Sequence, residues 1–153
     1  ELKKTGLLFN GQASAIKPKL NVARFWNQKS KYLVYARKLL KKGNSFCVKP
    51  HIDESDIIKT RDWLVKNIKG FGYKEASHFL RNIGFGRDIA ILDSHILKNL
   101  KTYSVIDEVP KTLTKKRYLE IEDKMRKFSR GISIPMDALD LLFWSRETGF
   151  VFK

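Results

Sequence analysis

The sequence predicts an all-α fold with two helical subdomains flanking a cleft. Apolar residues recur at three- and four-residue spacing in successive segments, and glycine, proline or an N-capping side chain stands at the segment ends. No convincing β-hairpin, internal repeat or low-complexity stretch is present. With 153 residues and 42% hydrophobic side chains, the chain fits one domain with an ordinary core, and we treat residues 1–153 as that domain.

The first predicted helix lies within residues 24–42, and Gly43 stops it. Its outer face is basic, and its apolar face contains Tyr32, Leu33, Ala36, Leu39 and Leu40. Residues 2–19 show no clean periodicity. Because the chain opens at Glu1 without a methionine, we expect some N-terminal residues to be missing from it.

A helix, a glycine turn and a second helix follow over about residues 54–83. Asp53 or Ser55 can cap the first of these helices, and Gly70 stands in the turn after it. The second begins at about Tyr73 and ends near Gly84. The apolar sides of the two helices contain Ile57, Ile58, Leu64, Val65 and Ile68 in the first, and Ala76, Phe79, Leu80 and Ile83 in the second.

Three more helices are predicted in the second half of the chain. After a loop at 84–92, Asp93 opens a short helix through Leu100, and residues 102–112 form a connector. Thr114 can cap the next helix, which Gly131 breaks. It carries Tyr118, Ile121, Met125 and Phe128 on its apolar face.

The last predicted helix starts near Ser133 and Pro135 and runs to about Glu147. Gly149 then releases the tail at 150–153. The inward residues of this last helix are expected to be Leu139, Leu142 and Phe143.

The net charge points to a polyanionic partner. Lys and Arg number 31 against 16 Asp and Glu, which gives a formal charge of +15. Nucleic acid is the leading partner, and the alternative is a merely solvated basic surface. No apolar run long enough to span a membrane and no signal peptide appears. Cys47 is the only cysteine, which excludes an intrachain disulfide and indicates a reducing intracellular compartment.

The glycine turn at 68–76 is the most informative stretch. Gly70 and Gly72 allow a tight turn, and the helix that begins at Tyr73 points free N–H groups at whatever lies in front of it, a phosphate-binding geometry. Lys74 stands in the first turn of that helix, where we expect more of its amine to be free for nucleophilic attack. Asp93 follows 19 residues later and is a good helix N-cap.

Together these motifs resemble the helix-hairpin-helix DNA glycosylases, and in particular the archaeal-type 8-oxoguanine DNA glycosylase/lyases. The resemblance covers the chain from about residue 24 to its end. It rests on Gly70-Phe71-Gly72-Tyr73-Lys74-Glu75-Ala76, on Asp93 with His95, and on Trp144-Ser145-Arg146-Glu147-Thr148-Gly149-Phe150-Val151-Phe152-Lys153.

The resemblance implies catalytic roles for Lys74 and Asp93. Lys74 would be the nucleophile, and Asp93 would orient the amine and stabilise positive charge that develops on the sugar. The plain alternative for Lys74 is a phosphate contact on a basic protein. Gly70, Gly72 and Tyr73 at the hairpin, together with His95, would contact the DNA backbone, although His95 is as readily a helix-surface residue.

Base recognition requires a pocket that stacks on the flipped base and reads its edge. Trp144 resembles the family's stacking residue, and Phe25 could be the opposite face, with core packing as its alternative. The α-carboxylate of Lys153 would accept the N7–H that 8-oxoguanine has and guanine lacks. Met136 and Asp140, on the last helix, are weaker candidates for the pocket wall.

The predicted function is therefore a bifunctional DNA glycosylase with AP lyase activity, which excises 8-oxoguanine in base excision repair. The chemistry requires no metal or organic cofactor. We expect a monomer that acts on double-stranded DNA containing oxidised guanine, in the cytoplasm with the chromosomal DNA and away from membranes. The alternatives are a non-catalytic helix-hairpin-helix module that only binds DNA and a glycosylase for another damaged base.

Overall fold

The computed structural model describes residues 6, 10–43 and 45–150. The chain divides into two compact units, Glu1–Phe71 and Gly72–Lys153. Apart from one very short strand pair, the regular structure of the described residues is helical, so the all-α prediction is confirmed.

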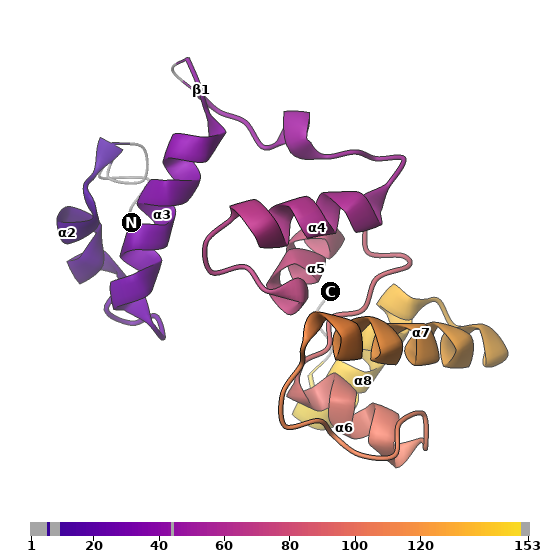
Figure 1. Ribbon diagram of the computed structural model, residues 1–153. Helices are drawn as coiled ribbons and strands as arrows, with labels where there is room; N and C mark the ends of the chain where they lie inside the picture. The colour runs from indigo at the N-terminus through magenta and orange to yellow at the C-terminus, as the bar shows by residue number, and fades with distance from the viewer. Residues whose placement is uncertain (1–5, 7–9, 44, 151–153) are drawn as a thin grey trace. The chain divides into compact units, whose positions relative to one another are not determined.

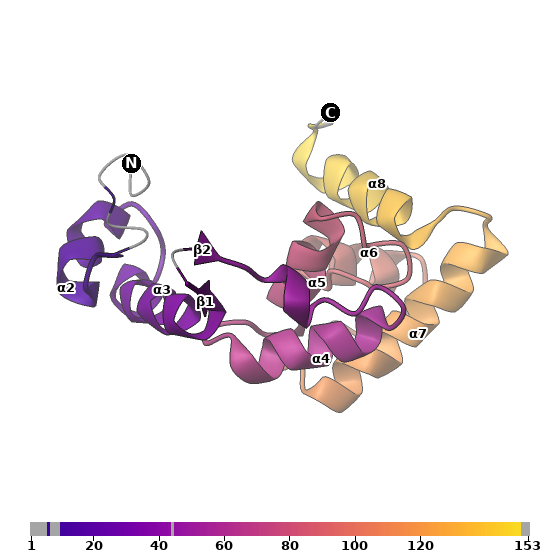
Figure 2. The same cartoon turned by 90° about the horizontal axis from the view of Figure 1, so that it is seen from above.

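In the first unit, the longest helix is α3 (Trp26–Leu40). Helix α2 (Ala13–Ile16) and the 3₁₀ turn η1 (Lys17–Leu20) lie against it (Figure 2). The Arg37 guanidinium, near the end of α3, donates a hydrogen bond to the Gly11 carbonyl. This contact ties a segment without helical periodicity to the predicted helix.

A two-residue strand pair follows α3 directly. Strand β1 (Lys41–Lys42) pairs antiparallel with β2 (Ser45–Phe46), with Lys41 opposite Phe46, and Gly43 has a φ of +59°. The expectation of no hairpin was therefore wrong. Strands of two residues are too short to show the alternating pattern by which a strand is recognised.

Helix α4 (Ile57–Asn67) comes after the 3₁₀ turn η2 (Lys49–His51), and its N-cap is Asp56. The Asp56 carboxylate accepts the N–H of Lys59 at 2.9 Å. The prediction of Asp53 or Ser55 as the cap was wrong, because these two residues bond to each other. The Asp53 carboxylate accepts the Ser55 N–H at 3.1 Å.

The described residues of the second unit form four helices, whose bounds agree closely with the predicted ones. Figure 1 shows α6, α7 and α8 gathered into one group, and the contacts of α8 with α6 and α7 support this view. The helices are α5 (Tyr73–Asn82), α6 (Ser94–Thr102), α7 (Lys115–Gly131) and α8 (Met136–Thr148). Asp93 and Thr114 cap α6 and α7 as predicted, and Gly149 follows α8 with a φ of +73°.

The core of this unit is apolar and continuous. It contains Ala90, Leu92, Ile96, Leu97, Leu100, Ile106, Tyr118, Ile121, Met125, Met136, Leu139 and Phe143. Across the two units, four residues that were predicted to face inward are instead 39–52% exposed. They are Leu39 and Ile58 in the first unit, and Ile83 and Leu142 in the second.

Polar contacts hold α8 against α6. The Glu147 carboxylate accepts hydrogen bonds from Lys98 Nζ at 2.6 Å and from the Asn99 amide at 3.2 Å. The Arg146 guanidinium donates to Tyr103 Oη at 2.9 Å. These contacts stand within one helical turn of Trp144 and so fix the part of α8 that carries it.

Candidate functional site

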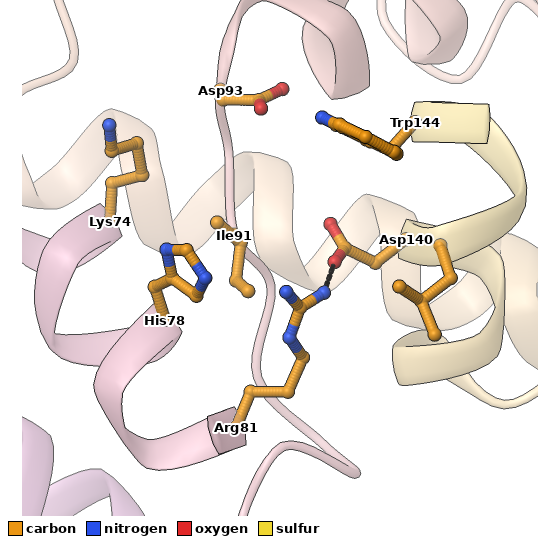
Figure 3. Close-up of a pocket in the computed structure, with 8 residues that line it drawn as sticks. Lys74, His78, Arg81, Ile91, Asp93, Asp140 and Trp144 are labelled. Carbon is orange, nitrogen blue, oxygen red and sulfur yellow. Dashed lines mark hydrogen bonds and ion pairs between the residues drawn. The ribbon is translucent and has the colours of Figure 1, made fainter. Parts of the chain in front are cut away.

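A cavity of about 380 Å³ opens in the second unit. Figure 3 shows Asp93 between Lys74, which projects from α5, and Trp144, which projects from α8. The residues that line it are Lys74, His78, Arg81, Ile91, Asp93, Asp140, Leu141 and Trp144.

The start of α5 positions Lys74. Gly72 is the N-cap, and its N–H donates to Glu75 Oε2 at 3.2 Å. The other carboxylate oxygen of Glu75 lies 3.0 Å from Lys74 Nζ. Partial burial opposes ionisation of Glu75, but the hydrogen bond from Lys74 and the backbone N–H donors hold its pKa below the usual value. Glu75 therefore closes the hairpin turn and holds the lysine head at the same time.

Asp93 is held by the helix that it caps. Its Oδ1 accepts the N–H groups of His95 and Ile96, both at 2.9 Å. These two hydrogen bonds satisfy backbone donors at the start of α6 and hold the carboxylate in place. The side chain is half-buried and faces the cavity.

The segment that leads to Asp93 is fixed by α7. Tyr118 Oη donates to the Ala90 carbonyl at 2.7 Å and accepts the Leu92 N–H at 3.3 Å. The buried Glu122 carboxylate accepts the Ala90 N–H at 2.8 Å. A buried loop must satisfy its backbone polar groups in this way. Asp93 is therefore carried on a rigid support.

An ion pair closes the cavity wall between α5 and α8. The Arg81 guanidinium donates to the carboxylate of Asp140, whose side chain is only 8% exposed. Burial raises the pKa of Asp140 to about 6, although the charge of Arg81 acts in the opposite direction.

His78 lies one helical turn after Lys74 on the same side of α5 and also lines the cavity. Partial burial and the positive charges of Arg81 and Lys74 lower the pKa of its imidazole below 6.5. The ring is therefore neutral at physiological pH and can accept a proton.

Comparison with known proteins identifies the family. The family model described as 8-oxoguanine DNA glycosylase matches residues 1–134. The chain belongs to the 8-oxoguanine DNA glycosylase family. The predicted helix-hairpin-helix glycosylase fold is thereby confirmed, and solved structures of the family superimpose on the chain.

Two relatives illustrate the similarity within the 8-oxoguanine DNA glycosylase family. The 8-oxoguanine DNA glycosylase/AP lyase of Fusobacterium nucleatum is 54% identical over 153 residues, which are 99% of this chain and 70% of the relative. That of Methanocaldococcus jannaschii is 43% identical over 131 residues, which are 85% of this chain and 60% of the relative. The chain thus spans about 60–70% of the length of these relatives.

Two solved structures match 99% of the chain. The M. jannaschii 8-oxoguanine glycosylase/lyase in complex with a 15mer DNA containing 8-oxoguanine matches with a TM-score of 0.81 and 39% identity, over 72% of that chain. The 8-oxoguanine DNA glycosylase of Thermotoga maritima matches with a TM-score of 0.80 and 36% identity, over 71% of that chain.

Four of the predicted site residues come together in the structure. Lys74, Asp93, Asp140 and Trp144 all line the cavity, although they come from three separate segments of the sequence. Asp140, which sequence reasoning supported only weakly, is a buried part of its wall.

The predicted DNA-contacting residues lie at the two helix starts. Gly70 adopts a φ of +88°, and Gly72 caps α5 with extended backbone. Tyr73 is half-buried and packs against the core, with its ring centroid 5.4 Å from that of Tyr118. His95 is half-buried in the first turn of α6. Their contacts with DNA stay predictions.

Three other predicted residues are not among those that line the cavity. Met136 is 2% exposed, belongs to the core and borders a separate cavity beside Arg87 and Arg130, so packing accounts for it. Phe25 stands in the first unit, where it is 59% exposed, has a φ of +60° and carries the Arg24 guanidinium over its ring. Its stacking role stays a prediction. Lys153 lies outside the described residues.

Sequence reasoning missed His78, Arg81, Ile91 and Leu141 among the lining residues. The spacing of His78 and Arg81 was the available signal, because residues four and seven positions after Lys74 fall on its side of a helix.

Among the described residues, no helix is long and apolar enough to cross a membrane.

Proposed function

We propose that this chain is a bifunctional DNA glycosylase and AP lyase that excises 8-oxoguanine from double-stranded DNA. The observation that carries the proposal is the presence of Lys74 and Asp93 on one cavity wall, with an amine and a carboxylate facing the same space. The names of the relatives, 8-oxoguanine DNA glycosylase/AP lyase, support it.

In the proposed reaction, the lesion is flipped into the cavity and Lys74 Nζ attacks C1′ of its sugar. The bond to the base breaks, the C1′–O4′ bond opens, and the nitrogen becomes a protonated Schiff base. The two protons that the lysine ammonium loses pass to the departing base and to O4′. β-Elimination then breaks the strand on the 3′ side. Lys74 must leave the carboxylate of Glu75, 3.0 Å away, before it attacks.

Asp93 assists by charge. Positive charge develops on the sugar as the base departs, and a fixed carboxylate lowers the energy of that transition state. Because two backbone N–H groups hold Oδ1, the carboxylate needs no reorganisation when the charge appears. The second oxygen, Oδ2, is left to face the substrate.

The base would be bound by α8. We propose that the indole of Trp144 stacks on it and that Arg81 with Asp140 forms the polar wall. Phe25 as the second stacking face and Lys153 as a contact of the lesion complete the proposed recognition. The proposed setting is chromosomal DNA inside the cell.

The test is borohydride trapping on a duplex with one 8-oxoguanine, beside undamaged and uracil-containing duplexes. Wild type is expected to give a covalent band on the lesion alone, and Lys74→Gln is expected to give none while retaining DNA binding. Lys127→Gln is a matched control, because it removes the same charge from an exposed lysine of α7. Tight binding by wild type with no band on any duplex would sink the catalytic proposal and favour a DNA-binding module.

A further inference from the structure

His78 occupies a distinctive place in the cavity. Lys74, His78 and Arg81 project into it from successive turns of α5 (Figure 3). Residues four apart on a helix lie about 5–6 Å apart at Cβ. Once Lys74 Nζ is joined to C1′, the neighbouring carbon C2′ is one bond further from the amine, within the same space that the imidazole borders.

We propose that His78 is the proton acceptor of the β-elimination step, a role that rests on the proposed lyase activity. Strand cleavage by β-elimination needs a proton acceptor for the C2′–H. Lys74 cannot serve as that acceptor while its nitrogen is bound in the Schiff base. The proposed nucleophile, Lys74, and the proposed proton acceptor, His78, therefore stand on consecutive turns of α5.

The step balances as follows. The C2′–H bond breaks, the proton moves to an imidazole nitrogen of His78, and the electron pair forms a C1′=C2′ double bond while the iminium nitrogen becomes neutral. The electrons then return, a C2′=C3′ double bond forms, and the C3′–O bond breaks with the 3′ phosphate as leaving group. No oxidant, reductant or metal is needed for the charge balance.

The carboxylates near the cavity are each held by partners on at least one oxygen, although Asp93 Oδ2 faces the substrate and Lys74 must leave Glu75 before it attacks. Asp93 Oδ1 accepts two backbone N–H groups, and the carboxylate of Asp140 is paired with Arg81. Glu75 is bound to Lys74 Nζ and to the Gly72 N–H. An imidazole is ordinarily a stronger base than an aspartate or glutamate carboxylate, and that of His78 lies one helical turn from Lys74.

The charged groups around His78 set the pH at which it works. Burial, Arg81 and Lys74 lower the pKa of the imidazole, while Asp93 and Glu75 act weakly in the opposite direction. Asp140, on α8, titrates in the same region with a pKa of about 6. A loss of wild-type elimination in acid therefore has two possible sources, and a variant without the imidazole separates them.

The experiment measures two quantities on a duplex with a preformed abasic site. One is the yield of borohydride-trapped adduct, and the other is the single-turnover rate of strand breakage. For His78→Ala we expect a wild-type yield of adduct and a rate of breakage about 100-fold lower. Added imidazole is expected to restore breakage in His78→Ala more than in wild type or Lys74→Gln. Because His78 is exposed and alanine favours helix, the variant is expected to fold.

The pH profile gives a second readout. Between about pH 8 and pH 5, wild-type breakage is expected to fall as the imidazole is protonated, and the rate with His78→Ala is expected to lose that dependence. Breakage by His78→Ala or His78→Gln near the wild-type rate would overturn the inference, as would a loss of trapped adduct together with breakage. Absence of adduct with wild type would instead mean that the proposed lyase function has failed.

Discussion

Asp93 uses one carboxylate for two tasks. Its Oδ1 caps α6 through the N–H groups of His95 and Ile96, and the same side chain faces the cavity that contains Lys74. The cap is a matter of hydrogen-bond acceptance, whereas the proposed catalytic task depends on charge. Substitutions at this one position can therefore separate stability from catalysis.

Asp93→Asn is expected to keep the cap and lose the charge. An amide oxygen accepts the same two N–H groups, so the free energy of unfolding should change by only about 0.5 kcal/mol, while excision of 8-oxoguanine falls on the order of 100-fold. Asp93→Ala is the matched comparison, because it removes both and costs about 1 kcal/mol of stability. Urea unfolding and single-turnover excision measure the two effects. Wild-type excision by Asp93→Asn would exclude a role for the charge.

At the scale of elements, the Arg81–Asp140 ion pair joins α5 to α8 inside the second unit. Burial opposes the ionised form of Asp140 more strongly than Arg81 favours it, and the pKa is therefore raised from 3.8 to about 6. The folded state binds this proton more tightly than the unfolded chain does. The contribution of this group to stability is thus fully present below about pH 4 and is lost as the pH rises to about 6.

Asp140→Asn tests that sign, because the amide does not titrate. The free energy of unfolding of wild type, relative to the variant, is expected to decrease by at most about 3 kcal/mol as the pH rises from about 4 to 7. Urea unfolding of both proteins at several pH values measures the difference. A difference that stays constant with pH would show that Asp140 is ionised throughout the range.

Gly70 is a turn residue whose replacement should be costly. Its φ is +88°, and an added Cβ would lie 2.6 Å from Cδ2 of Tyr32, within the same unit. Gly70→Ala is expected to destabilise the protein by more than about 2 kcal/mol and to weaken DNA binding. Gly43→Ala is the control, since its φ is +59° but no atom lies within 4 Å of the added Cβ, and it should cost about 1 kcal/mol. If Gly70→Ala and Gly43→Ala lower the thermal unfolding temperature equally, the Tyr32 ring moves aside at no measurable cost.

The ends of helices were predictable where a capping residue directly adjoins an apolar pattern of helical spacing. Asp93 and Thr114 each precede such a pattern and Gly149 follows one, and the structure confirms all three. The start of α4 was mispredicted because three of its four preceding residues can cap a helix, and only their mutual hydrogen bonds decide which one does. Sequence spacing does not contain that information.

Burial in α8 was harder to predict, because Leu139, Leu141, Leu142, Phe143 and Trp144 surround most of the helix. An apolar pattern this broad does not select one face, and Leu142 proved to be 52% exposed. For the same reason the sequence did not show which way Asp140 faces. Its side chain lies among these residues, is only 8% exposed and pairs with Arg81. Lys74 and Asp93 were recognisable because each opens a helix, where the sequence signals are strongest.

At the scale of the whole molecule, the formal charge of +15 dominates. Binding to duplex DNA releases counterions in proportion to the phosphates that lysines and arginines neutralise. If about six phosphates are neutralised, affinity is expected to fall on the order of 1,000-fold between about 50 and 200 mM salt. Fluorescence anisotropy with a labelled duplex measures the slope. An affinity that is nearly independent of salt would mean that the basic surface does not contact DNA.

The segment 89–92 joins α5 to Asp93 as a loop whose four residues are all buried. Its backbone is bonded to Tyr118 and Glu122, so each residue has a fixed place in the core. An insertion or deletion here would shift Asp93 relative to α5 and its Lys74, or leave a backbone amide without its partner. The exposed positions 107–109 carry no such constraint. Length variation among natural variants is therefore expected in that connector, and never in the four residues before Asp93.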